Sequence, residues 1–203
     1  MFILGLTGSI GMGKTTTAAM FAAEGIPVFD SDAEVHKLYR GAAAPAIEAA
    51  FPGVTENGVV DRRLLAEKVL ANPAALKKLE AIAHPLVGER WRAFVANEVK
   101  KGSAIVVLDV PLLFEAGLDR EVDAVVLVTA PEAVQKARVI ERPGMTSERL
   151  SVILARQTPD QEKRARSHFI IDTSRGFSSA KREVQAILRA LAGAKNKSRG
   201  SWS

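Results

Sequence analysis

The chain has 203 residues, of which 47% are hydrophobic and 25% are charged, a composition typical of a globular domain. It contains no cysteine, which excludes disulfides, thiolate zinc sites and cysteine nucleophiles, and no apolar run is long enough to cross a membrane. The net charge of +5 permits a nucleic-acid partner, but residues 136–166 hold eight basic and only four acidic residues. A small polyanionic ligand explains such a local excess equally well.

The N-terminal apolar run at residues 2–6 lacks a preceding basic segment, so we expect no signal peptide, no membrane anchor and a cytoplasmic location. This run predicts a short strand. It is followed by a motif with the spacing G-x-x-x-x-G-K-[ST] and then by a helix-forming run. The motif predicts a phosphate-binding loop (P-loop), because its glycines let backbone N–H groups turn toward phosphate oxygens at a helix start. The predicted nucleotide-binding residues are Gly8, Ser9, Ile10, Gly11, Met12, Gly13, Lys14, Thr15 and Thr16. We expect Lys14 to reach the β- and γ-phosphates and the Thr15 hydroxyl to bind Mg²⁺.

Residues 25–30 predict a turn and a short strand that ends on acidic residues. Ligands of open α/β sheets bind beyond the carboxyl ends of the strands, so Asp30 and Asp32 are expected to point toward the phosphate site. Ser31 and Asp32 also make a plausible helix start before residues 33–39. Both interpretations can hold at once.

From Ala33 to about Lys101 the apolar residues recur at helical spacing, with turn signals at Pro52-Gly53, Asn57-Gly58 and Asn72-Pro73. A helical insertion of this length between early strands is typical of a substrate-binding subdomain. Within it, His84 precedes Pro85 at a predicted helix boundary. A lone histidine is usually a cap or a surface group, so the residue type alone assigns no function to it.

A continuous apolar run at residues 104–108 ends in Asp109 and predicts a strand buried on both faces of a parallel sheet. An aspartate at this place in a P-loop protein normally steers Mg²⁺ or its water shell. The alternative is an aspartate that caps the following turn. Because Val110 and Pro111 follow Asp109, a helicase-like or transporter-like ATPase with an acidic pair is disfavoured.

Another buried strand is predicted at residues 123–129, and helices are predicted at 131–142, 147–157 and 160–166. Their arginines suit a mobile helical lid, because guanidinium groups bind phosphate oxygens in pairs and stabilise a transferring phosphoryl group. A solvated helix face is the usual alternative for any one of them. The arginines in question are Arg138, Arg142, Arg149 and Arg156.

The last predicted strand covers residues 168–172 and the last helix residues 178–192, before a polar, basic tail at 193–203 that we expect to be disordered. Together the elements predict an α/β fold, with a parallel sheet of the P-loop NTPase type flanked by helices. Its expected parts are a core at 1–32, 102–137 and 167–192, a helical subdomain at 33–101 and a lid at 138–166. Nothing in the sequence predicts the oligomeric state.

In this order the motifs resemble the dephospho-CoA kinase family over nearly the whole chain before the tail. The resemblance lies in the P-loop, in Val28-Phe29-Asp30-Ser31-Asp32, Val60-Asp61-Arg62, His84-Pro85-Leu86-Val87 and Asp109-Val110-Pro111-Leu112-Leu113-Phe114-Glu115, and in Arg138, Arg142, Arg156-Gln157, Lys163 and Ile170-Ile171-Asp172. It implies a kinase that transfers the γ-phosphoryl group of ATP to the ribose 3′-hydroxyl of dephospho-CoA, with Mg²⁺ and without nucleic acid or membrane partners.

The resemblance also implies roles for individual residues. Asp32 is expected to orient and deprotonate the acceptor hydroxyl, with Asp30 the weaker candidate, and Arg138 and Arg142 to contact ATP phosphates. Acceptor-side residues would be His84, Asp109, Leu113 and Glu115. Lys14 and Asp32 should then face each other across the γ-phosphoryl group, because phosphoryl transfer depends on in-line alignment and on cations around that group.

The chain departs from the family pattern at several positions. Ser9 and Met12 replace a usual glycine and serine, and His36 stands where arginine is common. His168 and Thr173 replace a usual aspartate and asparagine near the expected adenine site, so base specificity is the least determined property.

Two alternative functions remain open from the sequence. One is another small-molecule kinase of the same fold that acts on a nucleoside or nucleotide. The other is a P-loop switch or a nucleic-acid-binding ATPase, but the chain lacks an N-K-x-D guanine motif and an interleaved basic and aromatic stretch for base stacking.

Overall fold

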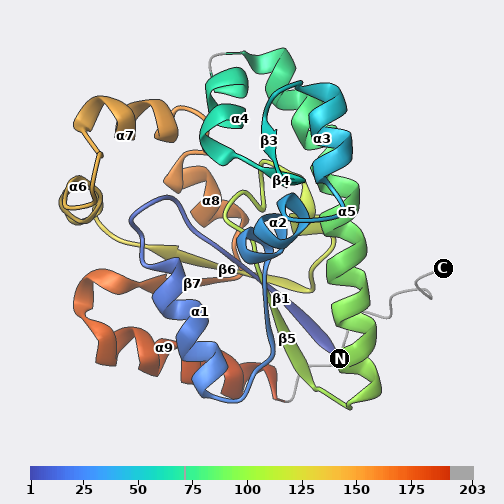
Figure 1. Cartoon of the computed structure of the whole chain (residues 1–203). Helices are drawn as coiled ribbons and strands as arrows, with labels where there is room; N and C mark the ends of the chain where they lie inside the picture. Colours follow the sequence, from blue (N-terminus) through green and yellow to red (C-terminus); the bar gives the residue numbers. More distant parts are fainter. Residues whose placement is uncertain (71, 193–203) are drawn as a thin grey trace. The chain divides into compact units, whose positions relative to one another are not determined.

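The computed structural model of the chain describes residues 1–70 and 72–192 (Figure 1). The predicted disordered tail therefore lies outside the described residues. The fold divides into two compact units. Among the described residues, the first unit comprises 1–29 and 98–192, and the second comprises Asp30–Asn97.

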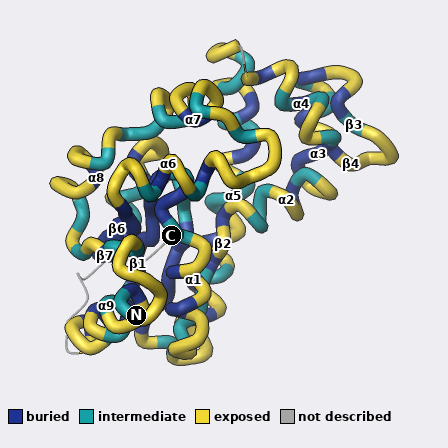
Figure 2. Tube along the Cα trace, turned by 90° about the vertical axis from the view of Figure 1, so that its left-hand side faces the viewer, coloured by how far each residue is buried: buried dark blue, intermediate teal, exposed yellow. Residues whose placement is uncertain are grey.

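A five-stranded sheet in the order β2-β5-β1-β6-β7 organises the first unit. The strands are β1 (Phe2–Thr7), β2 (Val28–Asp30), β5 (Ile105–Asp109), β6 (Ala124–Thr129) and β7 (Phe169–Asp172). The pairs β1–β5, β1–β6 and β6–β7 are parallel, which confirms the predicted fold class. Strands β5 and β6 are buried along their whole length, as expected of apolar strands inside a parallel sheet. Figure 2 shows β6 in the colour of buried residues.

Helices α1 (Lys14–Ala23) and α9 (Phe177–Leu191) pack against one face of this sheet and close the main apolar core. In α9 the buried residues are Ala180, Val184, Ile187 and Leu191, the spacing of one helix face. The remaining helices of the described part of the unit are α6 (Glu132–Ile140), α7 (Ser147–Leu154), α8 (Asp160–Arg166) and the short η1 (Leu118–Arg120) and η2 (Thr173–Arg175). No helix among the described residues combines the length and the apolar character needed to cross a bilayer.

The second unit has its own apolar core, to which Ile47, Val54 and Leu65 contribute. Its elements are α2 (Ser31–Tyr39), α3 (Ala44–Ala50), β3 (Thr55–Glu56), β4 (Val59–Val60), α4 (Arg62–Val69) and α5 (Pro73–Lys100), of which α5 continues past residue 97. The hairpin β3–β4 was not expected from the mostly helical pattern. Asn57 and Gly58 connect its strands with φ angles of 50° and 76°, and an Asn-Gly pair with both φ angles positive is a common two-residue hairpin turn.

The predicted helix boundary at Pro85 is wrong, because α5 continues through this residue. Proline lacks the N–H of a helical hydrogen bond and costs about 3 kcal/mol in a helix interior. Apolar residues on both sides of it, Leu79 and Leu86 among them, pack against the core of the second unit. This packing on both sides offsets the local cost, so the helix continues.

Asp61, which belongs to the Val60-Asp61-Arg62 motif, caps helix α4: its carboxylate accepts hydrogen bonds from the N–H groups of Arg63 and Leu64 at 2.8 and 3.2 Å. We expect Asp61→Ala to lower the free energy of unfolding by about 1 kcal/mol, since the first turn loses its cap. Urea titration followed by circular dichroism measures this change. Asp61→Asn retains an acceptor and should stay close to wild type, and equal losses in the two variants would contradict the capping role.

Candidate active site

The P-loop connects the end of β1 to the start of α1, as the sequence predicts. Gly13 is the N-cap residue of α1 with a φ of 91°, and Gly11 has a φ of 79°, both in the left-handed region that favours glycine. Gly8 is needed for another reason, because a Cβ there would lie 2.6 Å from the Val128 carbonyl oxygen. The glycines thus set the path of the loop and let it lie close against β6.

Three consecutive carbonyl groups of the P-loop accept hydrogen bonds from side chains outside the loop. The bonds run from Gln135 Nε2 to Ile10 O at 2.7 Å, from Arg138 Nη1 to Gly11 O at 3.5 Å and from Thr173 Oγ1 to Met12 O at 2.8 Å. The peptide bond is planar and trans, so each following N–H points away from the carbonyl before it. The N–H groups of Gly11 and Gly13 therefore point away from α6 and η2, as a phosphate site requires.

Arg138 contacts both the loop and η2. Its guanidinium donates to Thr173 Oγ1 at 2.8 Å and to Thr173 O at 2.9 Å, besides the longer bond to the loop. In this structure Arg138 therefore stabilises the P-loop from the side of α6 and η2. Arg142, beyond the end of α6, is exposed, and contacts of either arginine with ATP phosphates stay a prediction.

Lys14 and Asp109 form an ion pair of 2.5 Å between Nζ and Oδ1, with side chains 13% and 5% exposed. Asp109 is the last residue of β5, and the parallel register places it beside Leu6 of β1, directly before the loop. The strand ends thus bring together a cation for phosphates and a carboxylate that can help hold a metal ion. Thr15, the other predicted metal-binding residue, is exposed in the first turn of α1.

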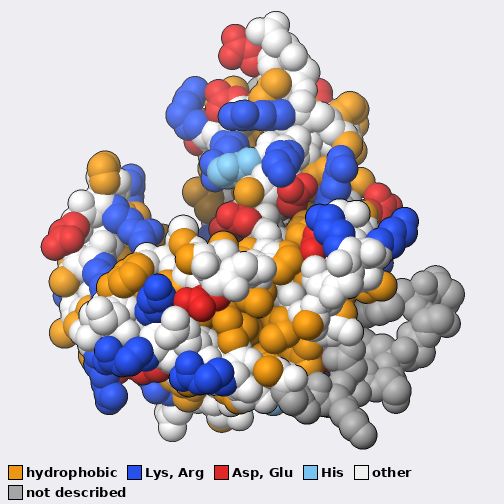
Figure 3. Space-filling view, turned by 90° about the horizontal axis from the view of Figure 1, so that it is seen from below, with side chains coloured by type: hydrophobic (Ala, Val, Ile, Leu, Met, Phe, Trp, Pro, Cys, Tyr) orange, Lys and Arg blue, Asp and Glu red, His pale blue; other side chains and the backbone are white. Residues whose placement is uncertain are grey.

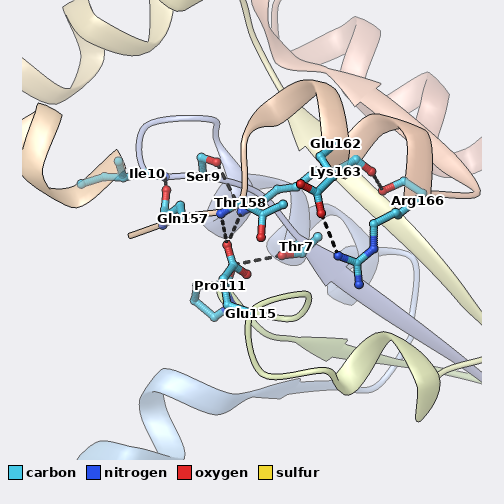
Figure 4. A network of polar contacts seen from close by, with 11 residues as sticks. Thr7, Ser9, Ile10, Pro111, Glu115, Gln157, Thr158, Glu162, Lys163 and Arg166 are labelled. Atoms are coloured by element: carbon cyan, nitrogen blue, oxygen red, sulfur yellow. Dashed lines mark hydrogen bonds and ion pairs between the residues drawn. The ribbon is translucent and has the colours of Figure 1, made fainter. Parts of the chain in front are cut away.

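A second ion pair contacts the loop through Ser9: Lys163 Nζ is 3.0 Å from Glu115 Oε1 and 3.4 Å from Ser9 Oγ (Figure 4). Glu115 also accepts the Thr158 N–H at 2.7 Å. Partial burial acts to raise the pKa of Glu115, but the Thr158 hydrogen bond, its own backbone N–H and the Lys163 cation together hold that pKa below the ordinary value. The carboxylate is therefore ionised at neutral pH.

The predicted site residues Asp30 and Asp32 both lie at the start of α2. Asp30 is the N-cap, and its Oδ1 accepts the Ala33 N–H at 2.9 Å. The cap is thus one residue earlier than the Ser31–Asp32 start that the sequence suggests, and it leaves Asp32 exposed in the first turn. Asp32 and the exposed His84 belong to the second unit and Lys14 to the first, so their meeting across a phosphoryl group stays a prediction.

The other predicted residues have contacts that sequence reasoning does not supply. Leu113 is buried, and a Cβ at Gly5 would lie 3.0 Å from its Cδ2, so its part in acceptor binding stays a prediction. His168 accepts the Val125 N–H at Nδ1 over 3.1 Å, and its own N–H donates to the Val125 carbonyl. His168, which departs from the family pattern, thus bonds to both backbone groups of Val125 and extends the hydrogen bonding of β6.

Three residues that support the site were given no role from the sequence: Gln135, Gln157 and Lys163. Gln135 is buried on the same face of α6 as Val139. A polar residue in the apolar register of a helix was the available signal, because a buried amide needs a hydrogen-bond partner. Gln157 and Lys163 were recognised only as parts of a motif.

Comparison with known proteins agrees with the geometry. The family model described as dephospho-CoA kinase matches residues 2–179. The dephospho-CoA kinase of Mesorhizobium japonicum is 58% identical over 193 residues, which cover 95% of this chain and 98% of that protein.

Among solved structures, a crystal structure from Thermus thermophilus aligns with a TM-score of 0.78 and 33% identity, covering 96% of this chain and 98% of its own. The dephospho-CoA kinase from Campylobacter jejuni aligns with a TM-score of 0.64 and 21% identity over 93% of this chain and 96% of its own. The latter likeness supports the fold.

We expect Thr173→Val to weaken both the fold and ATP binding, because the isosteric side chain removes the hydroxyl that joins Met12 O to Arg138. A buried carbonyl left without its donor costs about 1–3 kcal/mol. Urea unfolding and calorimetric titration with ATP measure the two effects. Thr173→Ser keeps the hydroxyl and serves as the control, and serine and valine variants with equal ATP affinity would rule out this role.

Proposed function

This chain belongs to the dephospho-CoA kinase family, and on that premise we propose that it transfers the γ-phosphoryl group of ATP to the ribose 3′-hydroxyl of dephospho-CoA. The products are coenzyme A and ADP. The observation that carries the proposal is the P-loop with its Lys14–Asp109 pair, set in a chain that the family matches over residues 2–179. The loop indicates the phosphate site, and membership of the family indicates dephospho-CoA as the acceptor.

The chain's own groups account for much of the ATP side of this reaction. The N–H groups of Gly11 and Gly13 and the positive end of helix α1 bind phosphate oxygens. Lys14 is 13% exposed beside Asp109 and can place its ammonium on the β- and γ-phosphates. A phosphoryl group in transfer carries its charge on oxygen, so these groups stabilise the transition state.

Mg²⁺ fits the donors at the strand ends. P-loop proteins hold this ion with a threonine hydroxyl, one carboxylate and phosphate oxygens, so a cluster of protein ligands is not required, and the described residues contain no such cluster. Thr15 and Asp109 are the residues that would hold it. When bound, the ion neutralises charge on the β- and γ-phosphate oxygens.

Asp32 is the proposed base for the acceptor. Both Asp30 and Asp32 are exposed at the start of α2, but Asp30 uses a carboxylate oxygen to cap the helix, which favours Asp32 as the base. A ribose hydroxyl is a weak acid, and a carboxylate within hydrogen-bond reach can accept its proton late in the transfer. His84, Asp109 and Leu113 remain proposed acceptor-side residues, whereas the Glu115 carboxylate is already engaged by Lys163 and the Thr158 N–H.

The lack of a nucleic-acid partner and the cytoplasmic location stay predictions. On the face shown in Figure 3, lysine and arginine side chains lie in separate groups between apolar and neutral ones. A continuous basic stripe is the usual footprint of nucleic-acid binding. The face in view therefore gives that alternative no support.

The proposal predicts that the protein converts dephospho-CoA to coenzyme A in the presence of ATP and Mg²⁺. Mass spectrometry of the reaction should show a product heavier by one phosphoryl group and dependent on both ATP and protein. Nucleosides and nucleoside monophosphates, tested at equal concentration, should be poor acceptors. Preferred phosphorylation of one of them would assign the chain to another reaction of the same fold.

For Asp32→Asn we expect a loss of roughly 10²- to 10⁴-fold in kcat, the usual contribution of a general base. The affinity for ATP should stay near the wild-type value, because phosphates bind through the P-loop. Steady-state kinetics and ATP titration separate the two effects. Asp30→Asn is the matched control, since asparagine still caps the helix and the loss should be much smaller. Wild-type turnover in Asp32→Asn would remove Asp32 from the role.

A further inference from the structure

Lys163 is a cation that the proposed chemistry does not use. Its side chain is fully buried, and its Nζ lies 3.0 Å from Glu115 Oε1 and 3.4 Å from Ser9 Oγ (Figure 4). A lysine is almost never fully buried without a partner, because its ammonium loses the solvation of water. Lys163 of α8 therefore links Ser9 of the P-loop to Glu115 in the turn of residues 111–117.

Glu115 makes a second contact with the same segment. Its Oε1 accepts the N–H of Thr158, which lies between α7 and α8. The preceding residue, Gln157, accepts the Ile10 N–H at its Oε1 over 3.3 Å. Figure 4 shows these residues converging from the P-loop, the 111–117 turn and the α7–α8 connection.

We propose that Glu115 and Lys163 are positioning residues for the phosphoryl transfer, an inference that rests on the proposed function. Their ion pair fixes the α7–α8 connection against the P-loop. The fixed connection places the side-chain oxygen of Gln157 where it accepts the Ile10 N–H. The Ile10 carbonyl in turn accepts a hydrogen bond from Gln135 Nε2 at 2.7 Å. It also fixes the backbone at Arg156, one of the arginines assigned to the lid, which directly precedes Gln157.

The contacts of Glu115 distinguish this role from direct acceptor binding. Both of its partners outside its own turn, Lys163 and Thr158, belong to the predicted lid, and its side chain is only 16% exposed. A carboxylate so engaged acts on the reaction through the elements it joins. Its removal should then change ATP binding and turnover together.

The test is a double-mutant cycle with Glu115→Gln, Lys163→Met and the double variant. Glutamine keeps an acceptor for Thr158, and methionine keeps most of the buried volume, so each change removes mainly charge. Each single variant leaves one charge of the pair without its opposite charge and should be less stable, whereas the double variant should recover stability, as buried pairs replaced together often do. Urea unfolding measures this part of the cycle.

Activity should follow a different pattern from stability. We expect kcat to fall roughly ten- to hundredfold in all three variants, because a small displacement of site groups has effects of this size. The KM for dephospho-CoA should stay unchanged. A kcat that recovers with stability in the double variant would show a structural role alone, and a KM for dephospho-CoA raised in Glu115→Gln alone would show direct acceptor contact. Either result overturns the proposal.

A readout without the acceptor separates this proposal from the proposed function. Calorimetric titration with a non-hydrolysable ATP analogue should show a roughly threefold to tenfold loss of affinity in the three variants. Wild-type affinity in all of them would contradict the proposal even if coenzyme A is formed. Failure of the wild-type protein to form coenzyme A, with the affinity losses present, would overturn only the proposed function.

Discussion

A phosphate-binding loop can point its N–H groups at a ligand only if its carbonyl groups, which then face away from the ligand, find hydrogen-bond donors elsewhere in the protein. In this protein Gln135, Arg138 and Thr173 donate to the carbonyls of Ile10, Gly11 and Met12. Because a buried carbonyl without a donor costs free energy, these side chains help hold the loop in the shape that binds phosphate. The sheet contributes by holding α6 and η2, which carry the three donors, next to the loop.

Much of the fold is predictable because its signals are local. Continuous apolar runs predicted the buried parallel strands, and β5 and β6 lie within one residue of the expected bounds. The errors arise where local rules compete with packing. Pro85 favours a helix end, but apolar contacts on both sides carry α5 through it. The β3–β4 hairpin was missed because the helical periodicity around it outweighed a two-residue turn signal at Asn57-Gly58.

The candidate site was predictable in its motif and not in its supports. The P-loop and Asp109 can be located from spacing, since one motif and one strand end specify them. The donors to the loop come from far along the chain: Gln135 is 125 residues from Ile10, and Thr173 is 161 residues from Met12. No local pattern encodes such a pair, so the sequence marked Thr173 only as a departure near the expected adenine site, and the structure adds its bond to the loop.

The two lysine–carboxylate pairs beside the P-loop have the same chemistry and different surroundings, which divides their functions. Lys163 is completely buried, so its ammonium cannot leave Glu115 without losing its charge partner, and the pair suits a fixed position. Lys14 keeps 13% of its side chain exposed, which fits the proposal that it exchanges the Asp109 carboxylate for phosphate oxygens. This exchange would make the Asp109 carboxylate available to the proposed Mg²⁺ site. The difference in burial therefore fits the two proposed roles, a positioning role for Lys163 and a ligand-binding role for Lys14.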